Sequence, residues 1–439
     1  MAKRILSIVI IVIMTVPLML SGCNTAPEQP GSSETAEPGP AEEATAEPAD
    51  APEPTAVPEP TPEPLKPAFE TGEYRNVFKE YGYTDEQINA KLEEAWNTIF
   101  YGGENSRIYY ESGDDEAYIM DVGHGDIRSE GMSYGMMICV QLDKKTEFDK
   151  LWKWANTHMQ HSEGTREGYF SWSMKPDGTP NDPGPAPDGE EYFAMALFFA
   201  SHRWGDGQAP FDYSEQAKYI LRQALHKPDD TVGGYNMWNK ENKLILFVPG
   251  SQITDPSYHL PHFYELFSLW ADPEDSRFWK EAAAASREFL KLSCHPETGL
   301  APDYAGFGGY PIPTGGHDRF LDDAFRVAGN IGLDYLWFAA DPWQREQSNR
   351  IQAFFINEGL GRHYSGYKID GTPVENRNYQ STGLVAMNAM ASLAAYGPNV
   401  ELMIRDFWSK SPATGQWRYY DDCLYMFSLL ALSGNYRIW

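Results

Sequence analysis

Residues 126–137 read DIRSEGMSYGMM, and they decide the fold class. A single carboxylate, Glu130, heads an apolar run in which no charged residue follows until Asp143. The run predicts a helix, and a helix with no polar face must be surrounded by protein. Two later segments, STGLVAMNAMASLAAY from Ser381 and CLYMFSLLALSG from Cys423, have the same character. The chain therefore contains several helices that are buried on every side.

Helices with one charged face alternate with these buried ones. EFDKLWKWANTH, SEQAKYILRQAL and WQREQSNRIQAFF each carry their charges on one face, which predicts that they lie outside. Apolar periodicity and a capping box from Thr84 to Gln87 predict twelve helices, at about 84–101, 129–142, 145–161, 189–204, 213–227, 256–271, 277–293, 320–340, 343–358, 380–396, 399–410 and 418–433. Inner and outer helices in alternation predict an all-α (α/α)6 barrel (toroid) of six inner and six outer helices. An irregular α-solenoid is the alternative, although no repeat of fixed length favours it.

The composition excludes some partners. With 63 Asp and Glu against 35 Lys and Arg, the chain has a formal net charge of -28 and would repel nucleic acid and anionic lipid. A neutral ligand fits better, and 14% aromatic residues suit the apolar faces of sugar rings. Cys139, Cys294 and Cys423 show no metal-ligand spacing. We expect no cofactor, no metal ion and a monomer.

The N-terminus has the features of an exported lipoprotein. Two basic residues precede an apolar run at 5–20, and the Leu-Ser-Gly-Cys that ends at Cys23 is similar to a bacterial lipobox. We expect 1–23 to be the signal peptide with Cys23 as the lipidated residue, the alternative being a plain signal peptide with a chance cysteine. Residues 24–66, rich in Pro, Glu, Ala and Thr, predict a disordered tether ahead of a single catalytic domain at 67–439. The protein would then be extracellular, with only its lipid in the bacterial membrane.

Polar residues gather just before each predicted inner helix. If the inner helices run parallel, these segments meet at one mouth of the barrel. The segments are 126–130, 187–192, 254–259, 317–326, 378–381 and 417–422. Converging carboxylates beside aromatic residues suit acetal hydrolysis, in which one carboxyl protonates the leaving oxygen and another takes a proton from water. A single aspartate there is better explained as a helix cap, but six such sites on successive inner helices weaken that explanation, which stays open for Asp126, Asp318 and Asp421.

Four motifs in these segments resemble the signature regions of glycoside hydrolase family 8. They are EGMSYGMM with Glu130, PDGEEYFAMAL with Asp188, TDPSYHLPHFYELF with Tyr258 and LDDAFRVAGN with Asp323. The resemblance spans about 75–436 and is strongest to the xylan-directed members, the reducing-end xylose-releasing exo-oligoxylanases and the endo-β-1,4-xylanases. It implies an (α/α)6 barrel that hydrolyses β-1,4-xylosidic bonds in xylo-oligosaccharides or xylan with inversion and without a metal.

The resemblance also implies roles for individual residues. Glu130 would be the general acid, and Asp323, in an Asp-Ala-x-Arg pattern with Arg326, the general base. Asp188 matches the central carboxylate that grips the sugar at the cleavage point. Tyr258, in Pro-Ser-Tyr, matches a tyrosine near the nucleophilic water.

Two questions remain at the proposed catalytic pair. Asp322 is a rival for the base, although the family pattern favours the residue directly before Ala324. A helix N-terminus favours an ionised carboxylate, yet a general acid must hold its proton. We therefore expect desolvation, or the nearby Asp126, Asp188 and Asp323, to raise the pKa of Glu130.

Further residues at the mouth are candidates for substrate contact, namely Tyr258, Arg326, Asp126, Tyr192 and Tyr379, together with Trp172 and Trp238 in loops rich in Gly and Asn. One departure from the family matters. In the exo-acting members a Leu-His-Pro block before the tenth helix closes the aglycone end of the cleft. Here 378–382 reads NYQST, without that block, although Tyr379 and Arg377 remain candidates for a wall. The sequence leaves the reducing-end exo mode and the endo mode equally open.

Other functions compete with this interpretation. A family-8 endoglucanase or chitosanase would share the motifs. A cell-surface lipoprotein that binds xylo-oligosaccharides without cleaving them would alternate strands and helices in two lobes, whereas strand signals are confined here to about 107–120 and 243–248. A polysaccharide lyase needs a group that neutralises a uronate, and an acidic mouth opposes this.

Overall fold

The computed structural model describes residues 66–228 and 235–439. Contacts group the described residues into one compact unit. The signal peptide and lipobox predicted for 1–23, and the tether predicted for 24–66 except its last residue, lie outside the described residues. No helix in the described ranges combines the length and the apolar character needed to cross a membrane.

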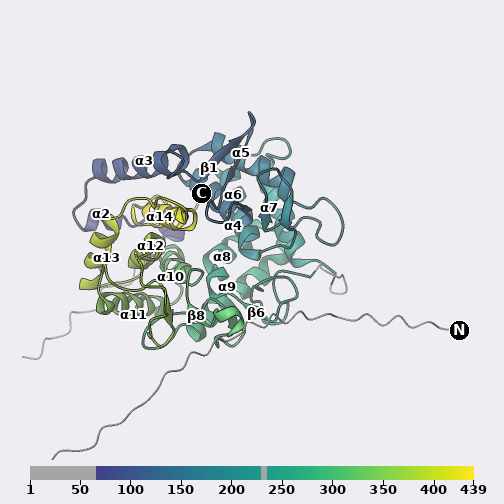
Figure 1. The fold of residues 1–439 in the computed structure, drawn as a ribbon. Helices are drawn as coiled ribbons and strands as arrows, with labels where there is room; N and C mark the ends of the chain where they lie inside the picture. The colour runs from purple at the N-terminus through teal and green to yellow at the C-terminus, as the bar shows by residue number, and fades with distance from the viewer. Residues whose placement is uncertain (1–65, 229–234) are drawn as a thin grey trace, which may run out of the picture. The chain divides into compact units, whose positions relative to one another are not determined.

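Helices dominate the described chain (Figure 1). They are α1 (Ala68–Thr71), α2 (Val77–Glu80), α3 (Asp85–Tyr101), α4 (Ser129–Gln141), α5 (Lys145–Trp154), α6 (Pro187–Trp204), α7 (Tyr213–Leu225), α8 (Pro261–Trp270), α9 (Ser276–Ser293), α10 (Phe325–Phe338), α11 (Trp343–Glu358), α12 (Thr382–Met390), α13 (Pro398–Trp408) and α14 (Arg418–Leu432). Helices α3 to α14 correspond one by one to the twelve predicted helices, and the predicted capping box opens α3.

The twelve long helices form two concentric layers. Helices α4, α6, α8, α10, α12 and α14 pack in that order, and α14 returns to α4, which closes the inner ring. Each inner helix also packs against the outer helix that follows it, with α3 taking this place for α14. Figure 1 shows the labels of the inner helices surrounded by those of the outer ones. This is the predicted (α/α)6 barrel, and it excludes the two-lobed architecture of a binding lipoprotein.

Burial explains the layer that each helix takes. In α4, every residue except Glu130 is buried, as its lack of a polar face predicts. In α9, Arg277 and Lys280 are exposed while Trp279 and Ala282 face the barrel. Since full burial of one large apolar side chain stabilises a protein by about 1.5–3 kcal/mol, the inner ring supplies much of the stability of the fold.

Short antiparallel strands fix the segments at the barrel mouth. They are β1 (Tyr109–Ser112), β2 (Glu116–Ile119), β3 (Ile127–Arg128), β4 (Ser173–Met174), β5 (Pro180–Asp182), β6 (Ile253–Thr254), β7 (Ala305–Gly306), β8 (Arg319–Phe320) and β9 (Tyr367–Lys368). The sheets are β1-β2, β3-β4-β5, β6-β7 and β8-β9. Because β3, β6 and β8 lie just ahead of α4, α8 and α10, the pairing anchors the residues that enter each of these inner helices.

Some predicted boundaries are wrong, for local reasons. The helix expected from 256 begins at Pro261, because Pro256–Tyr258 forms a separate 3-10 turn. The helix expected from 320 begins at Phe325, because β8 pairs with β9 and a turn follows that carries Asp323. Strand signal near 107–120 corresponds to β1 and β2, whereas 243–248 makes only an isolated bridge between Trp238 and Ile245.

Candidate active site

A cleft at the barrel mouth has two halves, and both are lined by Arg128, Glu130 and Asp323. The aromatic half, with a volume of about 420 Å³, is also lined by Ser129, Trp172, Pro185, Ala186, Asp188, Phe247, Val248, Tyr258, Tyr304 and Arg326. The acidic half, about 260 Å³, is also lined by Asp121, His124, Asp322, Tyr379, Ser381, Trp417, Tyr419, Tyr420 and Asp421. Each of the six inner helices, or the segment directly before it, contributes to this lining. The predicted gathering of polar residues at one mouth is therefore present.

Glu130 lies in the first turn of α4, at the junction of the two halves. Its side chain is 16% exposed, and its Oε1 accepts a hydrogen bond of 2.9 Å from the Tyr419 hydroxyl. The next residue makes this contact possible, because a Cβ at Gly131 would lie 2.5 Å from the Tyr419 ring. The Glu-Gly pair in the opening motif thus places a carboxyl in the cleft and leaves room for its hydrogen-bond donor.

Arg326 holds the carboxylates of the cleft together. Its guanidinium is almost fully buried, and Nη1 donates to Glu130 Oε2 and to Asp188 Oδ2, each at 3.0 Å. Nη1 also lies 2.6 Å from the Tyr134 hydroxyl, and Nη2 donates to Asp323 Oδ1 at 3.2 Å. Since Glu130 and Asp323 bind different nitrogens of one guanidinium, these two oxygens lie within about 9 Å of each other, below the upper limit of about 9.5 Å for inverting glycosidases.

The protonation of Glu130 suits a general acid. Burial raises its pKa to about 7, the cation of Arg326 opposes this shift, and the charges of Asp188 and Asp323 add to it. Burial likewise raises the pKa of Asp188, against the pull of Arg326. Burial and two of the three predicted neighbours, Asp188 and Asp323, thus raise the pKa of Glu130 despite its position at a helix N-terminus. The third, Asp126, accepts hydrogen bonds from Arg128 and Ser173 instead.

Aromatic rings line the aromatic half together with Asp323. Tyr258 stacks on Phe247 with ring centres 6.0 Å apart, and Phe247 contacts Tyr304 at 4.4 Å. The guanidinium of Arg326 lies 5.5 Å from the centre of the Tyr258 ring. Flat apolar rings beside hydrogen-bonding groups match the two kinds of surface that a sugar presents.

A charged pair closes one part of the acidic half. Arg377 Nη1 donates to both carboxylate oxygens of Asp322 at 2.8 Å and to the Tyr379 hydroxyl at 2.9 Å. Asp322, the other candidate for the general base, therefore forms an ion pair with Arg377. Tyr379 is 48% exposed and lines the cleft, whereas Arg377, the other predicted candidate for a wall, is bonded to two of the lining residues and does not line the cleft itself.

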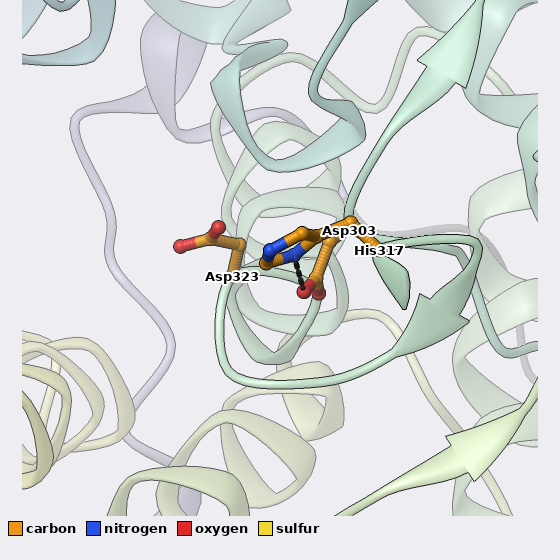
Figure 2. Close-up of side chains that lie close together, drawn as sticks. All are labelled: Asp303, His317 and Asp323. Atoms are coloured by element: carbon orange, nitrogen blue, oxygen red, sulfur yellow. Dashed lines mark hydrogen bonds and ion pairs between the residues drawn. The ribbon is translucent and has the colours of Figure 1, made fainter. Parts of the chain in front are cut away.

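Among the described residues, one group has the residue types and spacing for a metal ion: Asp303, His317 and Asp323, whose ligand atoms lie within 4.8 Å of one another. His317 Nδ1 already bonds to Asp303 Oδ2 at 2.9 Å. In Figure 2 the Asp323 carboxylate points away from the other two side chains. The group is thus a hydrogen-bonded pair beside Asp323 rather than a closed set of ligands, and the prediction of no metal stays a prediction.

The structure separates the two tryptophans that sequence treated alike. Trp172 lines the aromatic half, with the guanidinium of Arg128 5.6 Å from its ring centre. Trp238 is 1% exposed and packs edge-on against Tyr264 and Trp279, behind the cleft. The prediction of substrate contact for Trp238 is therefore corrected, because its ring fills the space between an inner and an outer helix.

Two other predicted contacts also lie away from the cleft. Tyr192 is buried in the barrel interior, where its ring meets Tyr134 and Phe427. Asp126 is buried between β3 and β4 and supports Arg128, a residue that does line the cleft. Tyr258, Arg326, Tyr379 and Trp172 do line it, as predicted.

Sequence reasoning missed several residues of the site. The sequence pattern places Tyr134 in the apolar run, although it follows Glu130 by one helical turn and so shares its face. Tyr419 and Asp255 fall within the mouth segments but received no role. Phe247, Tyr304 and Asp303 come from loops whose position only the fold decides.

Known proteins with similar sequences support these observations. The reducing-end xylose-releasing exo-oligoxylanase Rex8A of Paenibacillus barcinonensis is 54% identical over 377 residues, which cover 85% of this chain and 99% of that protein. The reducing end xylose-releasing exo-oligoxylanase of Halalkalibacterium halodurans is 54% identical over 374 residues, 85% of this chain and 96% of that protein. Endoglucanase 2 of Ruminiclostridium josui is more distant, at 28% identity over 71% of this chain and 64% of that protein.

Solved structures agree with the sequence comparison. The crystal structure of a reducing end xylose-releasing exo-oligoxylanase matches with a TM-score of 0.83 at 57% identity, over 85% of this chain and 98% of that one. Rex8A from Paenibacillus barcinonensis complexed with xylose matches with a TM-score of 0.83 at 55% identity, over 85% and 99%. The model of the glycosyl hydrolases family 8 matches residues 119–434, which include all six inner helices and every carboxylate described above. The chain is therefore an O-glycosyl hydrolase, and it belongs to glycosyl hydrolase family 8.

Proposed function

We propose that the protein hydrolyses β-1,4-xylosidic bonds in xylo-oligosaccharides with inversion of configuration. The observation that carries this proposal is the position of Arg326, which holds Glu130 and Asp323 on separate nitrogens at the junction of the two halves. A substrate that spans the cleft would place its scissile bond there. We infer that the sugar is xylose from the similar proteins, since both relatives at 54% identity are exo-oligoxylanases.

In this mechanism Glu130 donates its proton to the leaving oxygen while Asp323 takes a proton from the attacking water. A pKa of about 7 keeps Glu130 protonated in mildly acidic solution, and the 34% exposure of the Asp323 side chain leaves room for water beside it. Asp188, a buried carboxylate that shares Arg326 Nη1 with Glu130, would bind the sugar at the cleavage point. Tyr258 would contact the same sugar from the aromatic half.

Substitutions in a related protein support this assignment. Solved structures of reducing-end-xylose releasing exo-oligoxylanase include a glutamate-to-alanine variant complexed with xylobiose, and variants in which an aspartate is replaced by asparagine or serine. The replaced glutamate and aspartate are separated by the same number of positions as Glu130 and Asp323.

We further propose that the enzyme acts at the reducing end and releases xylose. Support comes from the acidic half, which is the smaller of the two and ends at the bonded set of Asp322, Arg377 and Tyr379. This set would stand where the exo-acting relatives carry their Leu-His-Pro block. A wall at this position leaves space for one sugar beyond the scissile bond.

One experiment tests the reaction, its stereochemistry and its mode. Xylohexaose is digested before and after borohydride reduction of its reducing end, and the first product is followed by proton NMR. We expect xylose and xylopentaose from the unreduced sugar alone, with the new reducing end formed as the α-anomer. Mixed oligomers from both sugars would contradict the exo mode, and a β-anomer would contradict inversion.

We also propose that the protein is exported and anchored at the outer face of the bacterial membrane through Cys23. The support is the lipobox-like sequence that ends at this residue. Labelling cells with a radioactive fatty acid should mark the native chain and not the Cys23→Ser variant. Equal release of both forms into the medium would contradict the anchor and leave the catalytic proposal unaffected.

A further inference from the structure

A pair of side chains behind Asp323 has no part in the mechanism described so far. We propose that Asp303 and His317 are positioning residues, which together fix the turn that carries Asp323 and place a positive charge beside its carboxylate. This inference rests on the proposed role of Asp323 as the general base.

Asp303 determines the shape of the turn. Its side chain is buried, and its Oδ1 accepts hydrogen bonds of 3.1 Å from the backbone N–H groups of Leu321 and Ala324. In the sequence these two amides lie on either side of Asp322 and Asp323. One buried acceptor therefore holds the backbone on both sides of Asp323, just ahead of α10, and the Asp303 N–H in turn donates to the Arg319 carbonyl at 2.8 Å.

His317 connects this acceptor to the base. Its Nδ1 bonds to Asp303 Oδ2 at 2.9 Å, and its ring stacks on Tyr304 with centres 4.2 Å apart and planes 19° apart. The ring is thus held by a hydrogen bond at one edge and a flat contact on its face. Figure 2 shows the imidazole beside Asp323, whose carboxylate lies within 4.8 Å of the ligand atoms of the pair.

The charges around the pair favour a protonated imidazole. The hydrogen bond to Asp303 raises the pKa of His317, and the charges of Asp303, Asp323 and Asp322 add to this. Burial raises the pKa of Asp303 to about 7 against the hydrogen bond from His317. Two backbone amides donate to Asp303 Oδ1 and the imidazole bonds to Oδ2, and these three hydrogen bonds favour a carboxylate at Asp303 and a proton on Nδ1 of His317.

Other charged groups surround the same turn. Arg326 bonds to Asp323, Arg377 balances Asp322, Asp255 adds a buried carboxyl near Asp323, and Arg319 pairs with Asp318. A ring nitrogen of His317 lies within 4.8 Å of a carboxylate oxygen of Asp323, so a protonated imidazole there attracts the negative charge of Asp323.

The test is the pH dependence of kcat/KM on xylotetraose. The acid limb of this profile reports the base of the free enzyme. In His317→Gln we expect that limb to move about one unit to higher pH, since an opposite charge typically shifts a neighbouring carboxyl by about one unit or more. This is a roughly tenfold loss of kcat/KM on the acid side, with kcat on the plateau changed less than about threefold.

Asp303→Asn separates the two functions of the pair. The amide keeps an acceptor but no charge, so we expect the same shift of the acid limb together with a fall in plateau kcat, because the turn is held less firmly. His226→Gln is the matched control: it removes a histidine paired with Asp275 on the outer layer and should leave the profile unchanged.

The outcomes distinguish the two proposals. An acid limb in His317→Gln that coincides with that of the native enzyme, at equal melting temperature, would overturn the positioning role. Retention of activity in Asp323→Ala would instead remove the general base on which it rests. If His317→Gln does not fold, the acid limb of Asp303→Asn decides, since the loss of the carboxylate lowers the charge of the imidazole.

Discussion

The aromatic half and the acidic half of the cleft share three residues and differ in almost everything else. The aromatic half has a volume of about 420 Å³ and presents the rings of Trp172, Phe247, Tyr258 and Tyr304. The acidic half has about 260 Å³ and ends at ion-paired side chains around Asp322. Aromatic rings can pack against the apolar faces of successive sugars. We therefore expect the aromatic half to bind the sugar chain and the acidic half to limit the length of the leaving group.

The largest expected effect lies at the junction that both halves share. Glu130→Ala and Asp323→Ala should each lower kcat by about 10²–10⁴-fold or more, since each removes a proton-transfer group. Steady-state kinetics on xylotetraose measures this, with circular dichroism to show an unchanged fold. Asp322→Asn serves as the comparison, because its carboxylate is held by Arg377. A loss in Asp322→Asn equal to that in Asp323→Ala would contradict the choice of base.

Substitutions of Trp172 and Trp238 test whether the aromatic half binds the substrate. Trp172→Ala should raise KM for xylotetraose about tenfold, equivalent to about 1.4 kcal/mol of binding, with little change in stability. Trp238→Ala should lower the free energy of unfolding by about 3–5 kcal/mol, because it empties a buried site, and leave KM unchanged. Kinetics and urea denaturation of both variants give the comparison. A raised KM in Trp238→Ala at full stability would restore the original sequence-based prediction.

The acidic half is tested by opening its wall. Tyr379→Ala should let longer leaving groups enter, so that xylobiose appears beside xylose among the first products of xylohexaose. We expect kcat for xylose release to fall less than about tenfold, since the catalytic carboxyls are untouched. Chromatography of early products measures the ratio. An unchanged pattern would show that other residues set the length of the leaving group.

The smallest expected effect concerns the proton on Glu130. Its pKa of about 7 predicts that kcat/KM falls as the pH rises through about 7, because the general acid is then ionised. The cation of Arg128 lowers this pKa, so Arg128→Gln should move the alkaline limb to higher pH by a fraction of a unit. A limb near the ordinary glutamate value of about 4.3 would mean that burial does not protect the proton.

Much of the fold could be predicted from sequence because the composition of each barrel helix indicates whether it lies in the inner or the outer layer. The run after Glu130 lacks a polar face, so α4 could only be an inner helix, and the charged face of α9 could only lie outside. Boundaries failed at Phe325, where the pairing of β8 with β9 joins residues far apart in sequence. No local sequence pattern predicts such a pairing of distant strands.

The candidate site likewise has features that the sequence predicts and features that depend on tertiary contacts. The sequence by itself determined the inner helices and the gathering of carboxyls at their N-termini, and its family motifs led us to expect Glu130 and Asp323 as the catalytic pair. Only the tertiary structure decided that Trp172 enters the cleft while Trp238 fills the core, and that Asp303 holds the turn that carries Asp323. The physical reason is that helical periodicity is local, whereas the direction of a loop side chain depends on which distant segment it packs against.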